Sequence, residues 1–259
     1  MDFINTWIQP ISAQLKGNEM KNFKEVKHLE SINSFYQEGD YIDELMIDRE
    51  LELIKKCVNS YTSALEIGCG SGYSTEKLVK LFNEYEVVEP SKKNIDLLKS
   101  KVENIKCYEV LLEDFKTEKK YDNIFFLNIL EHVEDPIDSL KILSELIKHE
   151  GLIFISAPNC MSLNRRAGYE MGALEHYEVL APKDYKVGHR RLYTVDMMID
   201  HCEKAGLKVL DVKGVYLKPL SESQMFNLGD DVIQAFMQLG EDVPEYSAGI
   251  FAIATKKYY

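Results

Sequence analysis

The sequence predicts a doubly wound α/β fold, in which helices cover both faces of one mostly parallel β-sheet. Short apolar segments alternate with amphipathic segments from residue 43 to residue 158, and strands that alternate with helices pair in parallel through right-handed crossovers. Residues 124–127 and 152–155 are continuously apolar, as is typical of central strands buried on both faces. The chain has 259 residues, of which 45% are hydrophobic, so one domain with a sizeable core is expected.

The first half of the chain contains the regular part of this pattern. Residues 43–58 place apolar side chains at three- and four-residue spacing with charges between them, which predicts an amphipathic helix before the first strand. The predicted strands are then residues 63–67, 85–89, 105–110, 121–128 and 151–158, and the helices between them are residues 74–82, 92–102 and 136–148.

The second half contains two further strands, residues 207–217 and 248–256, which bring the sheet to seven. Thr194 is the predicted N-cap of a helix that reaches Ala205, and Gly206 is its C-terminal stop. Two irregular insertions, residues 159–193 and 219–246, interrupt this half, and the second contains a helical stripe of apolar residues. Connections of this length are often functional, so we expect them to form a lid over an acceptor molecule.

The N-terminal residues 1–42 have a mixed character and are interpreted as a cover segment in front of a main domain of residues 43–259, with a short helix over residues 6–16. Tyr36 and Tyr41, at the end of this segment, are either part of a lid over a ligand or surface aromatic residues.

The charge of the chain bears on its partners. There are 31 Lys and Arg residues against 43 Asp and Glu, a formal net charge of -12, which argues against a surface that holds a nucleic acid backbone. No stretch approaches the roughly 18 apolar residues of a membrane-spanning helix, and the start lacks the features of a signal peptide. The 5 cysteines form no CxxC pair and match no zinc spacing, so we expect reduced thiols in a cytoplasmic protein.

The strongest functional motif is the run EIGCGSG, residues 66–72, which lies between a predicted strand and a predicted helix. Glycine allows the backbone to turn tightly there and to approach a ligand closely. Glu89 ends the next strand, where a carboxylate can accept hydrogen bonds from both ribose hydroxyls of an adenosine. The two features together predict a nucleoside-containing ligand.

With these residues, the chain resembles the class I S-adenosylmethionine-dependent methyltransferases. The resemblance rests on ALEIGCGSG, on Glu89 in VVEPS, on LLEDF and on YDNIFFLNILEHVEDP, and the last of these resembles the small-molecule subgroup that includes the ubiquinone-biosynthesis O-methyltransferases. It implies a Rossmann-like methyltransferase fold with an antiparallel last strand, S-adenosylmethionine as cofactor and no metal. It also implies that Glu66 faces the methionine amino group through its surroundings, and that Leu112 and Glu113 edge the adenine. The full set of predicted cofactor-binding residues, with Tyr41 from the possible lid added to those from the motifs, is Glu66, Gly68, Cys69, Gly70, Gly72, Glu89, Leu112, Glu113, Asn128 and Tyr41.

Two other protein classes share part of this signature. A nicotinamide dehydrogenase also joins a glycine-rich turn to a downstream acid, but here the third glycine of GxGxxG is replaced by Tyr73. A binding protein that senses the cofactor without catalysis is the second alternative, and the long polar insertion argues against it.

For the acceptor, the sequence predicts a small polar molecule that is methylated at oxygen or, alternatively, at nitrogen. An oxygen nucleophile generally needs a base, and His132 and His189 are the predicted bases because imidazole titrates near neutral pH. The insertion 159–193 is rich in Arg and His, which favours an anionic acceptor. The predicted acceptor-binding residues are Asn159, Arg165, His176, Arg190, Arg191 and Tyr193, and we expect a monomer or a homodimer.

Overall fold

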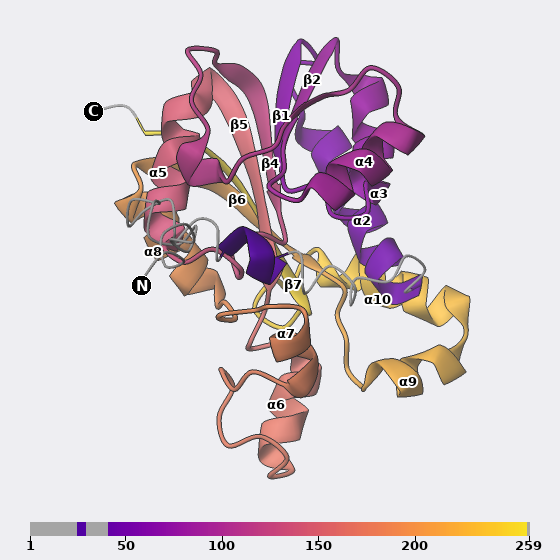
Figure 1. The fold of residues 1–259 in the computed structure, drawn as a ribbon. Coiled ribbons are helices and arrows are strands. Elements are labelled where there is room, and N and C mark those ends of the chain that lie inside the picture. Colours follow the sequence, from indigo (N-terminus) through magenta and orange to yellow (C-terminus); the bar gives the residue numbers. More distant parts are fainter. Residues whose placement is uncertain (1–24, 30–40, 258–259) are drawn as a thin grey trace, which may run out of the picture.

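The computed structural model describes residues 25–29 and 41–257, and it contains the predicted seven-stranded sheet (Figure 1). The strand order is β3-β2-β1-β4-β5-β7-β6. The strands are β1 (Ser63–Ile67), β2 (Glu84–Val88), β3 (Lys106–Tyr108), β4 (Tyr121–Leu127), β5 (Ile147–Pro158), β6 (Leu207–Val215) and β7 (Gly249–Lys256).

Strand β7 is antiparallel to both of its neighbours. It pairs with β5 on one side and with β6 on the other, whereas β1, β2, β3, β4 and β5 pair in parallel. The predicted fold class and the antiparallel last strand are therefore confirmed.

Helices cover both faces of the sheet, as Figure 1 shows. One face packs against α5 and α8 through Leu140, Leu143 and Met198, and the other packs against α2, α3, α4 and α10. The main helices are α2 (Tyr41–Cys57), α3 (Tyr73–Leu78), α4 (Lys92–Lys101), α5 (Pro136–Leu146), α6 (Leu163–Glu170), α7 (Pro182–Lys186), α8 (Val195–Lys204), α9 (Glu222–Met225) and α10 (Asp230–Gly240), with short 3-10 helices η3 (Val79–Leu81), η4 (Leu112–Asp114) and η5 (Phe226–Leu228).

Side-chain caps fix where the helices around the site begin. Ser91 accepts a hydrogen bond from the N–H of Asn94 at the start of α4, and Asp135 accepts from two backbone N–H groups at the start of α5. Thr194 caps α8, as predicted, by accepting from the N–H of Met197. Each cap satisfies backbone donors that the helix itself leaves unpaired.

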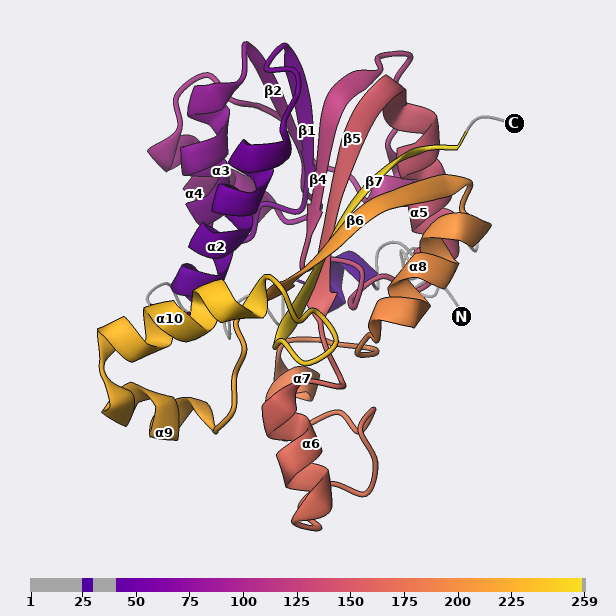
Figure 2. The same ribbon diagram turned by 180° about the vertical axis from the view of Figure 1, so that it is seen from behind.

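Both insertions project beyond the carboxyl end of the sheet, where Figures 1 and 2 place α6, α7, α9 and α10. A bridge between Asn159 and Tyr193 joins the two ends of the first insertion. Glu25 and Leu29, from the segment predicted to be a cover, line a cavity at this end of the sheet. The predicted helix over residues 6–16 and Tyr36 lie outside the described residues. Within the described part of the chain, no helix is long and apolar enough to cross a bilayer.

Candidate cofactor and acceptor site

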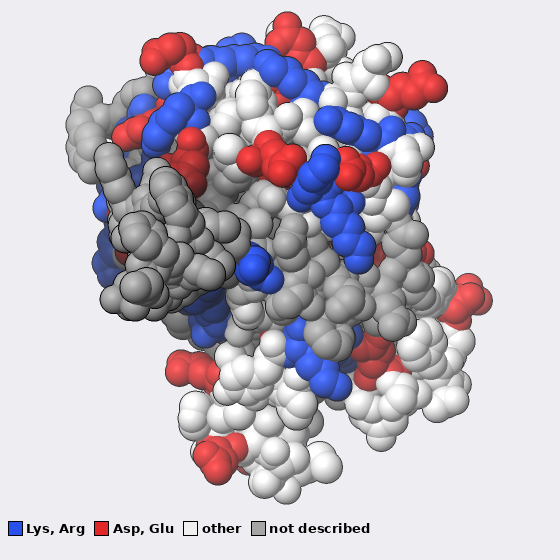
Figure 3. All heavy atoms as spheres, in the orientation of Figure 1, with Lys and Arg blue, Asp and Glu red and all other residues white. Residues whose placement is uncertain are grey.

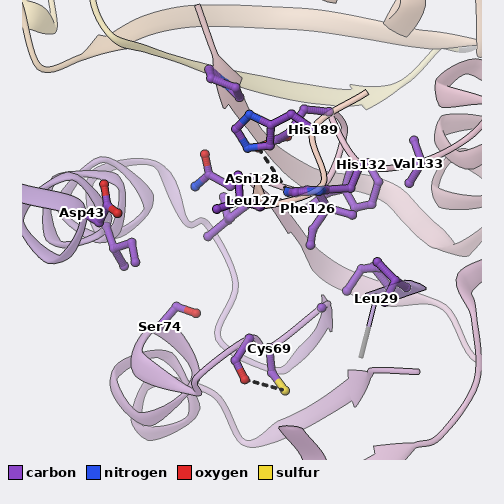
Figure 4. A pocket seen from close by; sticks show the side chains of 18 of the residues that line it. Leu29, Asp43, Cys69, Ser74, Phe126, Leu127, Asn128, His132, Val133 and His189 are labelled. Carbon is purple, nitrogen blue, oxygen red and sulfur yellow. Dashed lines mark hydrogen bonds and ion pairs between the residues drawn. The ribbon is translucent and has the colours of Figure 1, made fainter. Parts of the chain in front are cut away.

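A cavity of about 1240 Å³ lies at the carboxyl ends of β1, β2 and β4. Ligands of open α/β sheets bind at this edge, because the loops that follow neighbouring strands diverge there. The lining combines the loop after β1, Glu89 after β2, η4, the loop after β4 and residues of the first insertion, and Figure 4 shows some of these side chains.

The loop after β1 has the backbone conformation that requires glycine. Gly68 has φ +73°, and a Cβ at this position would lie 2.4 Å from Cδ1 of Ile129. Gly70 has φ +50°, and a Cβ there would meet no described atom within 4 Å, so this side of the loop is open. Gly68, Cys69 and Gly70 line the cavity, whereas Gly72 lies outside its lining and precedes α3.

Glu89 is buried, with 5% of its surface exposed, and lines the cavity. One carboxylate oxygen accepts the N–H of Cys69 at 3.1 Å and the other accepts the N–H of Ser91 at 2.8 Å. Burial raises its pKa. Because a carboxylate oxygen can accept more than one hydrogen bond, both oxygens keep capacity for ligand hydroxyls.

Glu66 lies outside the cavity lining. Its carboxylate accepts hydrogen bonds from Ser74 Oγ at 2.8 Å, Thr75 Oγ1 at 2.6 Å and the hydroxyl of Tyr85 at 3.0 Å. These bonds tie the start of α3 to β1 and β2, so Glu66 holds the glycine loop in place and reaches a ligand only through its surroundings.

Glu50 on α2 is a cavity residue that sequence reasoning missed. It is 2% exposed, and Asn128 donates to its two oxygens at 3.3 and 3.4 Å. Burial raises the pKa of Glu50 to about 7. The sequence feature that could have identified Glu50 is its position on the apolar stripe of the helix, between Ile47 and Ile54, because an acid buried there needs a partner.

The remaining predicted cofactor residues divide in two. Leu112 and Glu113 of η4 and Asn128 line the cavity. Tyr41 does not, and its ring lies 6.1 Å from that of Phe226.

His132 and His189, the two predicted bases, lie beside each other in the cavity (Figure 4), with ring centroids 4.9 Å apart. His132 Nδ1 lies 3.2 Å from the carbonyl of Gly188, and His189 Nδ1 lies 3.0 Å from Asp184 Oδ1. Burial, reinforced by the nearby His189, lowers the pKa of His132 to about 4, so this ring is neutral at pH 7.

The predicted acceptor-binding residues lie outside the cavity lining. Arg165 donates to the carbonyls of Tyr177 and Val179, and Arg191 donates to the carbonyls of Leu130, Val133 and Glu134. Arg190 binds the carbonyl of His132 and the carboxylate of Glu25. These guanidinium groups fasten the insertion to its surroundings.

The other three predicted acceptor residues are equally removed from the cavity. Asn159 is buried and donates to the carbonyls of Pro244, Glu245 and Ser247. Tyr193 is fully buried, and His176 is exposed.

The described lining of the cavity is acidic. Among the described residues that form it, Lys183 and Lys218 are the only Lys or Arg. On the described part of the face in Figure 3, Lys and Arg lie interspersed with Asp and Glu. The positive cluster on which the expectation of an anionic acceptor depended is therefore not in the cavity, and that expectation loses its basis. The acids of the lining include Glu25, Asp43, Glu44, Glu50, Glu89, Glu113, Glu131, Glu134, Asp135, Asp138, Asp184 and Glu222.

Comparison with known proteins decides the family. The profile of a family described as "Methyltransferase domain" matches residues 36–212. The chain belongs to the S-adenosylmethionine-dependent methyltransferases. The membership confirms the resemblance and an enzyme that uses S-adenosylmethionine, and it sets aside the dehydrogenase and the non-catalytic binding protein.

Two curated relatives have about 30% sequence identity to the chain. The methyltransferase is 30% identical over 175 residues to the ubiquinone biosynthesis O-methyltransferase of Coxiella burnetii (strain RSA 493 / Nine Mile phase I), covering 65% of this chain and 72% of that protein. It is 30% identical over 182 residues to the protein of the same name from Aeromonas salmonicida (strain A449), covering 67% and 73%.

Solved structures share the fold of the methyltransferase. The N-methyltransferase NodS from Bradyrhizobium japonicum WM9, in complex with S-adenosyl-L-homocysteine, superposes with a TM-score of 0.58 at 13% identity, over 90% of this chain and 99% of that one. The plantazolicin methyltransferase BpumL, in complex with a pentazolic desmethylPZN analog and S-adenosylhomocysteine, gives 0.55 at 16% identity, over 91% and 99%.

Proposed function

We propose that the methyltransferase transfers the methyl group of S-adenosylmethionine to a hydroxyl oxygen of a small polar acceptor. The observation that carries this proposal is the cluster of Glu131, His132 and His189 in the cavity. Both rings direct Nδ1 to an oxygen acceptor, which favours the tautomer with the proton on Nδ1 and the lone pair on Nε2. An imidazole nitrogen with a lone pair can accept the proton of a hydroxyl, and an oxygen nucleophile generally needs such a base.

In this cavity Glu89 would hold the ribose hydroxyls of the cofactor, Leu112 and Glu113 would flank its adenine, and Glu50 and Asn128 would face its cationic methionine end. When ionised, the buried carboxylate of Glu50 would attract the ammonium and sulfonium charges, because opposite charges interact strongly away from water, and these cations would in turn favour its ionised form. Gly68 and Gly70 let the backbone approach the cofactor.

The chemical step is an in-line displacement. The acceptor oxygen forms a bond to the methyl carbon, the carbon–sulfur bond breaks, and its electron pair stays on sulfur to give neutral S-adenosylhomocysteine. The hydroxyl proton passes to His189 or His132. Of the two, His189 is the better base because its Nδ1 bonds to the carboxylate of Asp184. Alignment of the two reactants supplies most of the remaining rate enhancement.

Methylation at nitrogen is the second candidate, and the acidic lining favours it because a protonated amine would be attracted to the cavity. The names of the curated relatives support oxygen. A cytoplasmic location and a monomeric or homodimeric state stay predictions.

The test is release of S-adenosylhomocysteine by the purified chain across matched panels of hydroxyl and amine acceptors. Activity on hydroxyls alone supports the proposal, and activity on amines alone contradicts it. With an active acceptor, His189→Ala should lower kcat about 10²- to 10⁴-fold, as expected for loss of a general base, with cofactor affinity retained. The matched control is His149→Ala, an exposed histidine near the start of β5 at the opposite edge of the sheet. Full activity of both His132→Ala and His189→Ala would refute the assigned roles.

A further inference from the structure

Glu131 is a buried carboxylate with an incomplete set of partners. It is 1% exposed, and its Oε2 atom makes no hydrogen bond with the described residues. The positive charge of Arg191 lies near enough to act on Glu131, but its guanidinium donates to backbone carbonyls. A buried carboxylate oxygen without a donor is costly, so a cation bound at this wall of the cavity would be stabilised by Glu131.

Two imidazole nitrogens flank this carboxylate. Glu131 Oε1 lies 3.9 Å from His132 Nε2 and 3.9 Å from His189 Nε2. One potential ligand atom from each of the three residues lies within 4.8 Å of the others. Ligands held about 2.1 Å from one ion in a tetrahedral arrangement are roughly 3.4 Å apart, so the three atoms would each move by less than about 1 Å to bind it.

The outer nitrogens of both rings are already oriented as metal-binding histidines usually are. His132 Nδ1 lies 3.2 Å from the carbonyl oxygen of Gly188, and His189 Nδ1 lies 3.0 Å from a carboxylate oxygen of Asp184. A carbonyl or carboxylate at this position fixes the tautomer and turns Nε2 toward the metal.

We propose that Glu131, His132 and His189 bind one divalent transition-metal ion in the wall of the cavity. Two imidazoles and one carboxylate favour ions such as Zn²⁺ or Mn²⁺ over Ca²⁺, and three protein ligands leave positions open. The sequence did not predict this site, because His189 comes from the insertion and joins the other two only when the insertion folds over the loop after β4.

An open position gives the ion a part in the reaction, and this second half of the inference rests on the proposed function. An ion held by Glu131, His132 and His189 could bind the acceptor hydroxyl at an open position and would favour loss of its proton to solvent, without any change in its own oxidation state. The displacement at the methyl carbon would otherwise be the one described above. His132 and His189 would then act as ligands and not as bases.

The binding test uses the full-length chain, stripped with a chelator and titrated calorimetrically with ZnCl₂ and, separately, MnCl₂, without cofactor or acceptor. We expect one ion per chain. Glu131→Gln, which keeps the size of the side chain, and His189→Ala should each weaken binding at least tenfold, and His149→Ala should leave it unchanged. Asp184→Asn, which alters only the partner of His189 Nδ1, should weaken binding about 10- to 100-fold.

A spectroscopic measurement keeps the test independent of folding and of activity. Co²⁺ bound by two nitrogen ligands should give visible absorption bands that Glu131→Gln and His189→Ala shift or abolish, while thermal melts report whether each variant is folded. Binding weaker than about 0.1 mM for both titrated ions, or affinity that survives in both folded variants, would overturn the site.

Activity separates the two proposals. If the stripped enzyme methylates a hydroxyl at full rate while His189→Ala does not, the part of the ion in the reaction is refuted and the proposed base remains. If activity on a hydroxyl is lost on stripping and restored by Zn²⁺ or Mn²⁺, methyl transfer to oxygen and the metal site are supported, and the base roles of His132 and His189 are refuted.

Discussion

Replacing Glu89 by Gln tests the ribose contact with little change in shape. In the wild type each carboxylate oxygen accepts one backbone N–H, from Cys69 and from Ser91. Glutamine keeps the volume but replaces one of these oxygens, which accepts a backbone N–H and would also accept a ribose hydroxyl, by an NH₂ donor. One acceptor position is therefore lost both in the fold and in the complex.

The size of the effect follows from these bonds. A hydrogen bond to a charged group contributes about 1.5–3 kcal/mol, and each 1.4 kcal/mol changes an equilibrium constant about tenfold. Loss of one hydroxyl contact should therefore weaken cofactor binding by about 10- to 140-fold. The unpaired backbone N–H should lower the free energy of unfolding by about 1–3 kcal/mol, which is large enough to measure in the same preparation.

The assay is calorimetric titration of S-adenosylhomocysteine into wild type, Glu89→Gln and the control Glu109→Gln. Glu109 is an exposed carboxylate just after β3 and outside the cavity lining, so the control makes the same chemical change without the contact. Thermal melts show whether Glu89→Gln is folded. A folded Glu89→Gln with a Kd within about threefold of wild type would refute the assignment of Glu89 to the ribose.

Three further predictions concern the walls of the site. Burial raises the pKa of Glu50 to about 7 in the folded protein, whereas the unfolded chain releases this proton near pH 4.5. The contribution of Glu50 to wild-type stability should therefore fall by up to about 3 kcal/mol as the pH rises between these values, and Glu50→Gln should remove this dependence. Denaturant melts at pH 5 and 8 should show a smaller fall in stability for the variant than for wild type, and an equal fall would contradict the raised pKa. Asn159→Ala leaves three backbone carbonyls without a buried donor and should lower the free energy of unfolding by about 2–4 kcal/mol, read from urea midpoints, whereas a loss below about 0.5 kcal/mol would contradict the bonding. Gly68→Ala and Gly70→Ala both place a Cβ at positive φ and should both lower stability. The loss should be larger for Gly68→Ala, because its Cβ would also meet Ile129, whereas Gly70→Ala should in addition weaken cofactor binding, because its Cβ enters the open side of the loop where the cofactor is proposed to bind. Thermal melts and cofactor titrations of both variants measure the two effects, and unchanged cofactor affinity of Gly70→Ala would contradict the proposed position of the cofactor.

The fold was predictable because its signals are local. An apolar run such as residues 124–127 indicates a buried strand without reference to any other part of the chain, and Thr194 identifies a helix start by its own side chain. The glycine loop and Glu89 belong to this class as well, because both lie directly after strands whose position the pattern defines.

The acceptor side was not predictable in the same way, because the function of a polar side chain there depends on distant backbone. The sequence shows that Arg165 and Arg191 are charged, but not that carbonyl groups of neighbouring loops accept their hydrogen bonds. Glu50 was missed for the opposite reason, since an acid on a helix is ordinarily exposed and only folding places it beside Asn128.

The arginines of the first insertion nevertheless have a consequence for the chemistry. Arg191 holds the carbonyls of Leu130, Val133 and Glu134, and Arg190 holds the carbonyl of His132, so two adjacent guanidinium groups fix the loop that carries Glu131. His189 directly precedes them in the chain. Because these bonds join residues 190–191 to the loop that carries Glu131, they limit how far His189 and Glu131 can move apart. The arginine charges from which the sequence predicted acceptor binding instead bond to the loop that carries the groups proposed to act on the acceptor.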